Sequence, residues 1–528
     1  MSGLGARGGI ALRAHHRPNA MDIVGNRTLR DLWEELARTH PTVTGVVHED
    51  AAGAVASFTY GDLATRIVRS ANLLRSLGVQ RGDCVGVHLG NTVQQVECLF
   101  ALATIGAVCV PIHPRSTAVE CARVLSRVDA RLVVSEPGVR PPAGYPAEVR
   151  ELAVGRPSSV PGSYDDLRDR QPDELVDPVT LSSDDPAVVL FSSGSTAEPK
   201  GIVLTHANLL FSGVFVAWQS SLTAQDRLLT TMPACHVNYV LSALMPVLTA
   251  GATLVVVERY SARRFWRQVR GHDATVVQSI STIVRTMLLQ PPDPHDRDHR
   301  VREILYYLPI SDEEKAAFDT RFGARFLNSY GTSETLVGVL TDPPQGERRW
   351  PSIGRAGIGY EVRVAGQDCC ELPPRMHGEI QVKGVPGRTL MAGYHRDSAL
   401  TAAAYTQDGW FRTGDVGWVD EDGWFYFVDR ISHFIKRAGE NVSSAEVEEV
   451  LVAHPDIAEA AVIGVPDYLR DQAVKAFVVP ARGAVLTVAQ VTTWASGRLA
   501  GFKVPTEVEI VAALPYTSTF KVAKSALS

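Results

Sequence analysis

The chain contains 528 residues, of which 45% are hydrophobic and 21% are charged, a composition typical of globular enzymes that bury a large core. Its formal net charge of −6 at pH 7 is small for this length and gives no indication of a nucleic-acid partner or an anionic membrane partner. The longest strongly apolar stretch, residues 99–111, is too short to cross a bilayer. We therefore expect a protein of several domains that acts on small molecules.

Cysteine usage and the N-terminal residues bear on the cellular compartment. The seven cysteines form no Cys-x-x-Cys pair and no Cys/His cluster with metal-ligand spacing, which favours reduced thiols in a cytoplasmic protein. Residues 1–20 lack the apolar region of a secretory signal. We expect them to be a disordered tail, or sequence upstream of a natural start at Met21.

Helical and extended patterns alternate from about residue 29 to residue 430. Residues 60–77 and 92–105 have helical periodicity, and short β-branched runs follow each of them. This alternation predicts parallel sheets covered by helices. Residues 136–184, rich in Pro, Gly, Ser and Asp, are expected to form a variable connection.

The pattern changes beyond residue 350. Residues 379–383 and 424–428 are short alternating strands between glycines, which predicts a small antiparallel β-unit. From residue 431, two helical segments and two strands predict a compact α+β module of ordinary domain size. The predicted fold class is therefore α/β: a large N-terminal domain at 21–430, made of parallel sheets covered by helices plus a small β-unit, followed by a small mobile α+β domain at 431–528.

Residues 190–206, LFSSGSTAEPKGIVLTH, are the most informative stretch. An apolar strand runs into hydroxyls, a glycine and a lysine, and such a loop can direct several N–H and O–H groups toward one anion. It is not a Walker A loop, which requires Gly-Lys-Ser/Thr. A Ser/Gly surface turn is the alternative interpretation. The candidate phosphate-binding residues are Ser192, Ser193, Gly194, Ser195, Thr196 and Lys200.

Further blocks follow this loop in a fixed order. They are NSYGTSET at 328–335, GWFRTGD at 409–415, GWFYFVDR at 423–430, IKRAGENV at 435–442 and LPYTSTFK at 514–521. Together with the first loop they resemble the adenylate-forming enzymes, namely acyl-CoA synthetases, luciferases and peptide-synthetase adenylation domains. The resemblance covers essentially the whole chain from Met21, and it implies ATP and Mg²⁺ as cofactors.

The resemblance also implies roles for single residues in nucleotide binding. Tyr330 would stack on adenine, with Gly331 and Thr332 beside it. Asp415 would accept hydrogen bonds from both ribose hydroxyls, and Arg430 would reach the ribose or the phosphates.

Three catalytic roles are implied in the same way. Glu334 would hold Mg²⁺, which proteins bind through one or two carboxylates together with substrate phosphates. Lys521 would reach the substrate carboxylate and the α-phosphate during adenylation, with Thr196 also stabilising charge. Taken alone, each of these residues would be assigned to a turn or to a solvated surface.

Other segments resemble the carnitine/crotonobetaine–CoA ligase group of bacterial acyl-CoA synthetases. They are residues 21–36, 232–237, 258–266, 348–354 and 435–443. His236 stands where relatives place a histidine that gates the acyl pocket, although a lone histidine is more often structural. The candidate pocket residues are Cys235, His236, Asn238, Tyr239, Ser279, Ile280 and Ser281. Because they are small or polar, we expect a short or polar acid, with CoA as the simplest acceptor.

Three residues depart from the pattern of these relatives. Phe520 replaces a glycine before the terminal lysine, Ala438 replaces a glycine beside the pantetheine tunnel, and Ser432 replaces a charged hinge residue. These changes leave three alternatives open: a carrier protein in trans as the thiol acceptor, a diazotase that activates nitrite for an aryl amine in a natural-product pathway, and a catalytically silent nucleotide-binding relative.

Overall fold

The computed structural model describes most of the chain. The described ranges are 22–155, 162–192, 199–307, 310–336, 338–430, 434–437, 440–467, 471–499, 501–517 and 522–527. The expected tail at 1–20 and the predicted site residues Ser193, Gly194, Ser195, Thr196 and Lys521 lie outside these ranges.

The larger of two central sheets has nine strands in the described residues. In spatial order they are β15 (Arg355–Ala356), β14 (Leu340–Thr341), β13 (Phe326–Tyr330), β12 (Glu303–Tyr307), β11 (Val276–Ile280), β9 (Arg227–Thr230), β10 (Thr253–Val257), β1 (Thr44–Glu49) and β2 (Val55–Thr59). The strands from β13 to β1 run parallel, whereas β2, β14 and β15 are antiparallel additions at the edges. The TLVVV run of β10 is buried along its whole length, as a sheet covered on both faces requires.

The second central sheet has seven described strands. In spatial order they are β18 (Gly393–Tyr394), β8 (Lys200–Thr205), β7 (Pro186–Ser192), β4 (Val108–Pro111), β3 (Cys84–His88), β5 (Leu132–Ser135) and β6 (Arg150–Ala153). The pairs from β7 to β6 are parallel, and β8 returns antiparallel to β7. The loop that carries the predicted phosphate-binding residues therefore joins two neighbouring antiparallel strands.

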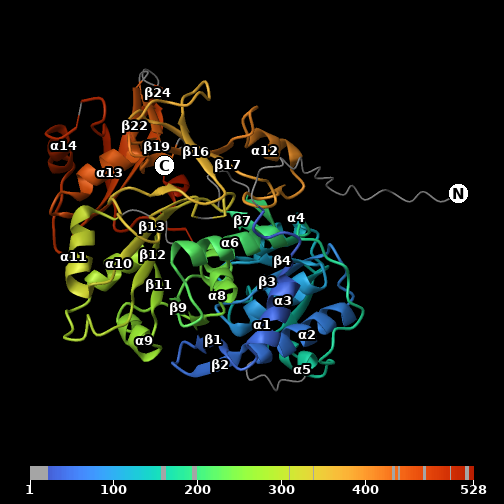
Figure 1. The fold of residues 1–528 in the computed structure, drawn as a ribbon. Coiled ribbons are helices and arrows are strands. Elements are labelled where there is room, and N and C mark those ends of the chain that lie inside the picture. The colour runs from blue at the N-terminus through green and yellow to red at the C-terminus, as the bar shows by residue number, and fades with distance from the viewer. Residues whose placement is uncertain are drawn as a thin grey trace.

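Helices fill the space between these sheets and cover their outer faces (Figure 1). The helices of the large domain are α1 (Leu29–Thr39), α2 (Tyr60–Ser76), α3 (Val93–Thr104), α4 (Ala118–Arg127), α5 (Tyr164–Asp169), α6 (His206–Gln219), α7 (Val237–Tyr239), the π-helical turn η1 (Val240–Leu244), α8 (Met245–Ala250), α9 (Phe265–Gly271), α10 (Ser281–Leu288), α11 (Asp312–Phe322) and α12 (Ser398–Ala403). α3 is buried on nearly all sides and contacts β4 and β7, while α8 contacts β10 and α6. One apolar core consequently spans both sheets.

The start of several helices is explained by the local sequence. Thr28, Thr59 and Thr205 each accept a hydrogen bond from the backbone N–H three residues on, and the Asp or Asn at that position bonds back to the threonine N–H. Such capping boxes satisfy N–H groups that a helix start otherwise leaves unpaired.

The small β-unit and the α+β C-terminal module are both present, and the module has three strands, β21, β22 and β25, beyond the two that the sequence predicted. An antiparallel sheet contains β16 (Glu361–Ala365), β17 (Gly378–Lys383), β19 (Phe411–Val419) and β20 (Phe425–Arg430). The C-terminal module contains β21 (Phe434–Arg437), β22 (Glu440–Ser443), α13 (Ser444–Val452), β23 (Ile457–Asp467), β24 (Asp471–Pro480), α14 (Val488–Ser496) and β25 (Glu507–Ile510). These elements, yellow-orange to red, lie toward the top of Figure 1.

The predicted fold class is confirmed, with a large domain of mainly parallel sheets and a small C-terminal domain. The connection at residues 136–184 holds β6 and α5, which its composition did not indicate. None of the helices in the described ranges combines the length and apolar character needed to span a bilayer. The domain boundary at 430/431 stays a prediction.

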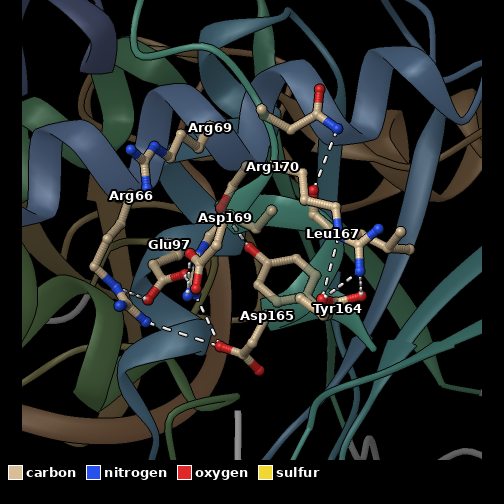
Figure 2. A network of polar contacts seen from close by, with 12 residues as sticks. Arg66, Arg69, Glu97, Tyr164, Asp165, Leu167, Asp169 and Arg170 are labelled. Atoms are coloured by element: carbon tan, nitrogen blue, oxygen red, sulfur yellow. Dashed lines mark hydrogen bonds and ion pairs between the residues drawn. The ribbon is translucent and has the colours of Figure 1, made fainter. Parts of the chain in front are cut away.

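A buried ionic cluster anchors α5 against α2 and α3 (Figure 2). Nη1 of Arg168 donates to Glu97 at 2.9 Å and to Asp165 at 2.8 Å, and Nε of Arg66 donates to Glu97 at 2.6 Å. Arg168 is 1% exposed, and both carboxylate residues are 0% exposed. Burial opposes the charge of Arg168, but the two carboxylates outweigh it and raise its pKa above the ordinary value.

Removing the central cation of this cluster should destabilise the large domain. Arg168→Ala leaves two buried carboxylates undercompensated, and breaking a buried ion pair costs about 3–5 kcal/mol. The neighbouring Arg170 is the matched control, because its side chain is 66% exposed in its pair with Asp166 and an exposed pair contributes at most about 1 kcal/mol. Urea unfolding followed by tryptophan fluorescence compares them, and equal midpoints for Arg168→Ala and Arg170→Ala would contradict the role assigned to the cluster.

Candidate active site

Three of the predicted nucleotide-binding residues lie in direct contact. Tyr330 ends β13, and its hydroxyl donates to Oδ2 of Asp415 at 2.7 Å. Arg430, directly opposite Asp415 in the β19–β20 ladder, places Nε 2.9 Å from Oδ1 of the same carboxylate. The contact therefore joins the nine-stranded sheet to the small β-unit.

The position of Asp415 follows from the turn that precedes it. Gly414 adopts a positive φ of 71°, a conformation that glycine reaches without strain, and the Asp415 N–H donates to Oγ1 of Thr413 at 3.0 Å. The residue is 2% exposed. Burial, with the adjacent carboxylate, raises the pKa of Tyr330 well above its ordinary value, so its phenol stays a hydrogen-bond donor.

Glu334 lies four residues after Tyr330 in the sequence and is located beside the seven-stranded sheet. Its Oε1 accepts a hydrogen bond from the Tyr394 hydroxyl at 3.0 Å, and its carbonyl accepts from the Met391 N–H at 2.8 Å. Nζ of Lys200 lies 5.5 Å from the centroid of the Tyr394 ring, a distance at which a cation interacts with an aromatic face. Tyr394 thus connects two predicted site residues, although no sequence motif pointed to it.

The environment of Glu334 is compatible with Mg²⁺. In the described part of the chain no cluster of three or more His, Cys, Asp or Glu side chains is arranged to hold a metal ion. Mg²⁺ needs no such cage, because it is commonly bound by one or two carboxylates together with substrate phosphates. The single carboxylate of Glu334 meets that requirement.

Gln278 joins the two segments that carry the predicted pocket residues, and Asn91 holds the start of the first of these segments in place. Nε2 of Gln278, in β11, donates to the Asn238 carbonyl at 2.9 Å, and its Oε1 accepts from Thr230 at 2.6 Å. Nδ2 of Asn91 donates to the Met232 carbonyl at 2.9 Å, and its Oδ1 accepts from the N–H immediately before Cys235 at 2.8 Å. Both amides are buried, and neither was identified from the sequence.

Strand register places the pocket residues at one edge of the nine-stranded sheet. Ile280, the last residue of β11, is opposite Tyr307, the last residue of β12, and Tyr330 ends the next strand. These are carboxyl ends of parallel strands, the edge at which α/β sheets usually bind ligands. Tyr239, Ser279 and Ile280 are buried there, and the remaining predicted pocket residues, Cys235, His236, Asn238 and Ser281, are half-buried.

The surrounding groups determine the tautomer of His236 and the protonation state of Cys235. Nδ1 of His236 accepts from the Asn238 N–H at 3.3 Å and caps α7, so the neutral ring carries its proton on Nε2. Burial raises the pKa of Cys235 to about 12, which keeps the thiol protonated and unreactive at neutral pH.

The end of β20 also contacts the C-terminal module. Oδ2 of Asp429 accepts from Oγ of Ser443 at 3.0 Å, from Oγ of Ser444 at 3.2 Å and from the Ala445 N–H at 3.1 Å. A carboxylate at a helix start stabilises the unpaired N–H groups there. Asp429 therefore holds the first turn of α13 next to Arg430.

Not all of the predicted site is described. Gly331 and Thr332 lie in the turn between Tyr330 and Glu334. The backbone of Ser192 ends β7, opposite Lys200, but its side chain lies outside the description. Ser432, Ala438 and Phe520, the three departures from the family pattern, also lie outside the described residues, together with Lys521.

Known protein families and individual relatives match nearly the whole chain. Residues 33–395 match the model of the AMP-binding enzyme family, and residues 446–521 match that of the AMP-binding enzyme C-terminal domain. A crotonobetaine/carnitine–CoA ligase of Salmonella paratyphi A is 42% identical over 522 residues, covering 96% of this chain and 100% of the relative.

Two solved structures share the architecture. ATP-bound MatB from Rhodopseudomonas palustris is 26% identical with a TM-score of 0.84, covering 95% of this chain and 98% of that chain. The o-succinylbenzoate coenzyme A synthetase MenE from Bacillus subtilis, in complex with ATP and a magnesium ion, is 25% identical with a TM-score of 0.81, covering 94% and 98%. The chain therefore belongs to the AMP-binding enzyme family, and it is an AMP-forming ligase of the acid–thiol type.

Proposed function

We propose that this ligase activates a small or polar carboxylic acid by adenylation and transfers the acyl group to CoA. The observation that carries the proposal is the contact of Tyr330, Asp415 and Arg430 beside Glu334, within a chain 42% identical to a CoA ligase. Enzymes of this type use ATP, Mg²⁺ and CoA.

Nucleotide binding is assigned to the residues around Asp415. Its buried carboxylate would accept hydrogen bonds from the two ribose hydroxyls, a charge-assisted arrangement. Arg430, which is half exposed, would stay near the ribose and phosphates. Tyr330, with Gly331 and Thr332, would form the surface for adenine.

Triphosphate binding is assigned to the residues between β7 and β8 and to Glu334. The hydroxyls and N–H groups of Ser192, Ser193, Gly194, Ser195 and Thr196, with Lys200, would surround the phosphates. Glu334 would hold Mg²⁺, which neutralises charge on the phosphate oxygens when bound.

The chemistry then takes two steps. A carboxylate oxygen attacks the α-phosphorus of ATP, the bond to the β-phosphate breaks, and pyrophosphate leaves with an acyl-adenylate retained. Lys521 and Thr196 would stabilise the charge that develops. The CoA sulfur then attacks the acyl carbon, the thiol proton is released, and AMP leaves.

The change between these steps is assigned to the C-terminal module. We infer a hinge near Ser432, where a few residues absorb the rotation, with His236 gating the acyl pocket. The Asp429 contacts with α13 would be broken and remade in each cycle.

The acid and the cellular setting are proposals drawn from the relatives and the pocket. Crotonobetaine and carnitine, named for the Salmonella ligase, are the first acids to test, and the polar pocket residues support other short polar acids. A carrier protein in trans would be an alternative acceptor. Seven free thiols and the use of ATP and CoA support a cytoplasmic location.

The relatives favour CoA transfer over the two other activities considered. Those compared above are CoA ligases or structural neighbours of them, so neither nitrite activation in a natural-product pathway nor a silent nucleotide-binding role is supported. The test is a screen of short acids for pyrophosphate release with and without CoA, including a nitrite and aryl-amine arm. We expect acid-dependent pyrophosphate, with AMP and a thioester only when CoA is present. Release with nitrite alone would contradict the proposal.

Lys521→Ala should strongly impair adenylation while leaving ATP binding intact. Loss of one preorganised donor at the developing charge lowers turnover by about 10²–10³-fold. Acid-dependent pyrophosphate exchange measures the step, and titration calorimetry measures ATP binding. Arg482→Ala, which removes an exposed cation of the same module, is the control. Unchanged exchange in Lys521→Ala would mean that this lysine has no part in the reaction.

Asp415→Asn should weaken ATP binding about 10- to 100-fold, because hydrogen bonds to a charged group contribute about 1.5–3 kcal/mol. Tyr330→Phe, which removes only the hydroxyl donated to Asp415, should have a smaller effect. KM for ATP and the Kd for AMP are the measurements. Asp422→Asn, which changes a 67% exposed carboxylate of the same β-unit, should match the unmodified enzyme. Equal ATP affinity in Asp415→Asn and Asp422→Asn would remove Asp415 from the site.

A further inference from the structure

Three uncharged polar side chains are buried together with elements of the candidate acyl pocket. Gln219 is the last residue of α6, Ser242 lies in the π-helical turn η1, and Tyr307 is the last residue of β12. Gln219 and Ser242 are 0% exposed, and Tyr307 is 7% exposed. None of the three was identified from the sequence.

In the described part of the chain, the polar atoms of these side chains make no regular hydrogen bond. Within the described residues, the amide nitrogen and oxygen of Gln219, Oγ of Ser242 and the Tyr307 hydroxyl make no hydrogen bond of regular length and angle. More than about 90% of buried polar groups in native proteins are paired, so several unpaired groups in one place require an explanation. An enzyme that binds a polar molecule there provides one.

These groups face one another around Tyr307. Burial raises the pKa of Tyr307 to about 12, and weak hydrogen bonding from Ser242 and Gln219 lowers it in part. These two side chains therefore lie close to the Tyr307 hydroxyl, although none of their contacts with it has the geometry of a regular hydrogen bond. The phenol is therefore protonated at neutral pH and able to donate. The absence of a side chain at Gly338 leaves space for the Gln219 amide. A Cβ at Gly338 would lie 3.3 Å from Oε1 of Gln219 and 3.1 Å from Phe215.

The cluster is continuous with the predicted pocket residues. η1 follows α7 directly, and His236 caps α7. Tyr307 is opposite Ile280 in the parallel ladder, and the same hypothetical Cβ of Gly338 lies 3.5 Å from Oγ of Ser329, the residue before Tyr330. π-helical turns are themselves frequent at functional sites.

We propose that Gln219, Ser242 and Tyr307 form the inner end of the acyl pocket and bind an uncharged hydrogen-bonding group, a carbonyl or hydroxyl, at the distal end of a short acyl chain. This inference rests on the proposed function above. The three side chains offer donors and acceptors but no charge, and an ion buried against them would be uncompensated. A trimethylammonium group would also leave the cluster unpaired, because it neither donates nor accepts an ordinary hydrogen bond.

The test compares acids that differ only at the distal group. Acid-dependent pyrophosphate release by the full-length enzyme is measured with 4-oxopentanoate, 5-oxohexanoate and 6-oxoheptanoate and with the matching 4-, 5- and 6-methyl branched acids. 4-(Trimethylammonio)butanoate is the charged arm. We expect kcat/KM for at least one oxo acid to exceed that of its methyl partner by about tenfold or more, since sites built for a hydrogen bond reject analogues without it.

Variants assign this preference to the cluster. Tyr307→Phe, Gln219→Leu and Ser242→Ala should each bring the oxo-to-methyl ratio closer to one by lowering kcat/KM for the oxo acid, with ATP affinity unchanged. Tyr306→Phe is the matched control, because it is the same chemical change on the same strand, and successive strand residues point to opposite faces. It should leave the ratio unchanged.

The outcomes separate this inference from the proposed function. Pyrophosphate release with the methyl acids but no oxo preference at any length would overturn the inference alone. So would a preference for the trimethylammonio acid that Tyr307→Phe weakens, or an oxo preference that Tyr307→Phe and Tyr306→Phe leave equally intact. No pyrophosphate release with any acid would overturn the proposed function, and the inference with it.

Discussion

The buried carboxylate of Asp415 is the contact on which the rest of the site depends. It accepts a hydrogen bond from Tyr330 at the end of the nine-stranded sheet and pairs with Arg430 on the adjacent strand of the small β-unit. A carboxylate this deeply buried is tolerable only when charged and hydrogen-bonding partners compensate it. Because these partners come from separate sheets, Asp415 fixes how the large sheet and the β-unit meet, at the place where we propose that the ribose binds.

A carboxylate with several hydrogen-bond donors also lies at the junction with the C-terminal module. Asp429, adjacent to Arg430, satisfies the first N–H and hydroxyl groups of α13. Within the module, Nζ of Lys524 lies 2.7 Å from Glu448 and also donates to Ser444. Hydrogen bonds of this kind are worth about 1–3 kcal/mol each, which is enough to define an orientation of the module and compatible with the rotation that we propose.

Much of this architecture was predictable from the sequence, because the pattern of apolar residues is local information. The helical spacing of residues 60–77 and 92–105 indicated the covering helices α2 and α3, and the β-branched runs after them indicated the buried strands β3 and β4. The ordered motifs pointed to Tyr330, Asp415 and Arg430, which the structure brings into contact, whereas their roles stay predictions. What the sequence could not reveal is set by contacts between distant segments: Tyr394 meets Glu334 only through a two-residue strand added to β8, and Gln219, Ser242 and Tyr307 converge from three elements without a shared motif.

Following the carboxylate oxygen of the acid into the products tests the proposed attack on the α-phosphorus most directly. The acid is labelled with ¹⁸O in both carboxylate oxygens, and the nucleotide products are separated after turnover with CoA. Attack on the α-phosphorus leaves one labelled oxygen in AMP, because the thiol displaces AMP from the acyl carbon without breaking its P–O bond. The proposed mechanism gives one ¹⁸O per AMP and unlabelled pyrophosphate. Formation of ADP, or label in any phosphate other than that of AMP, would contradict it.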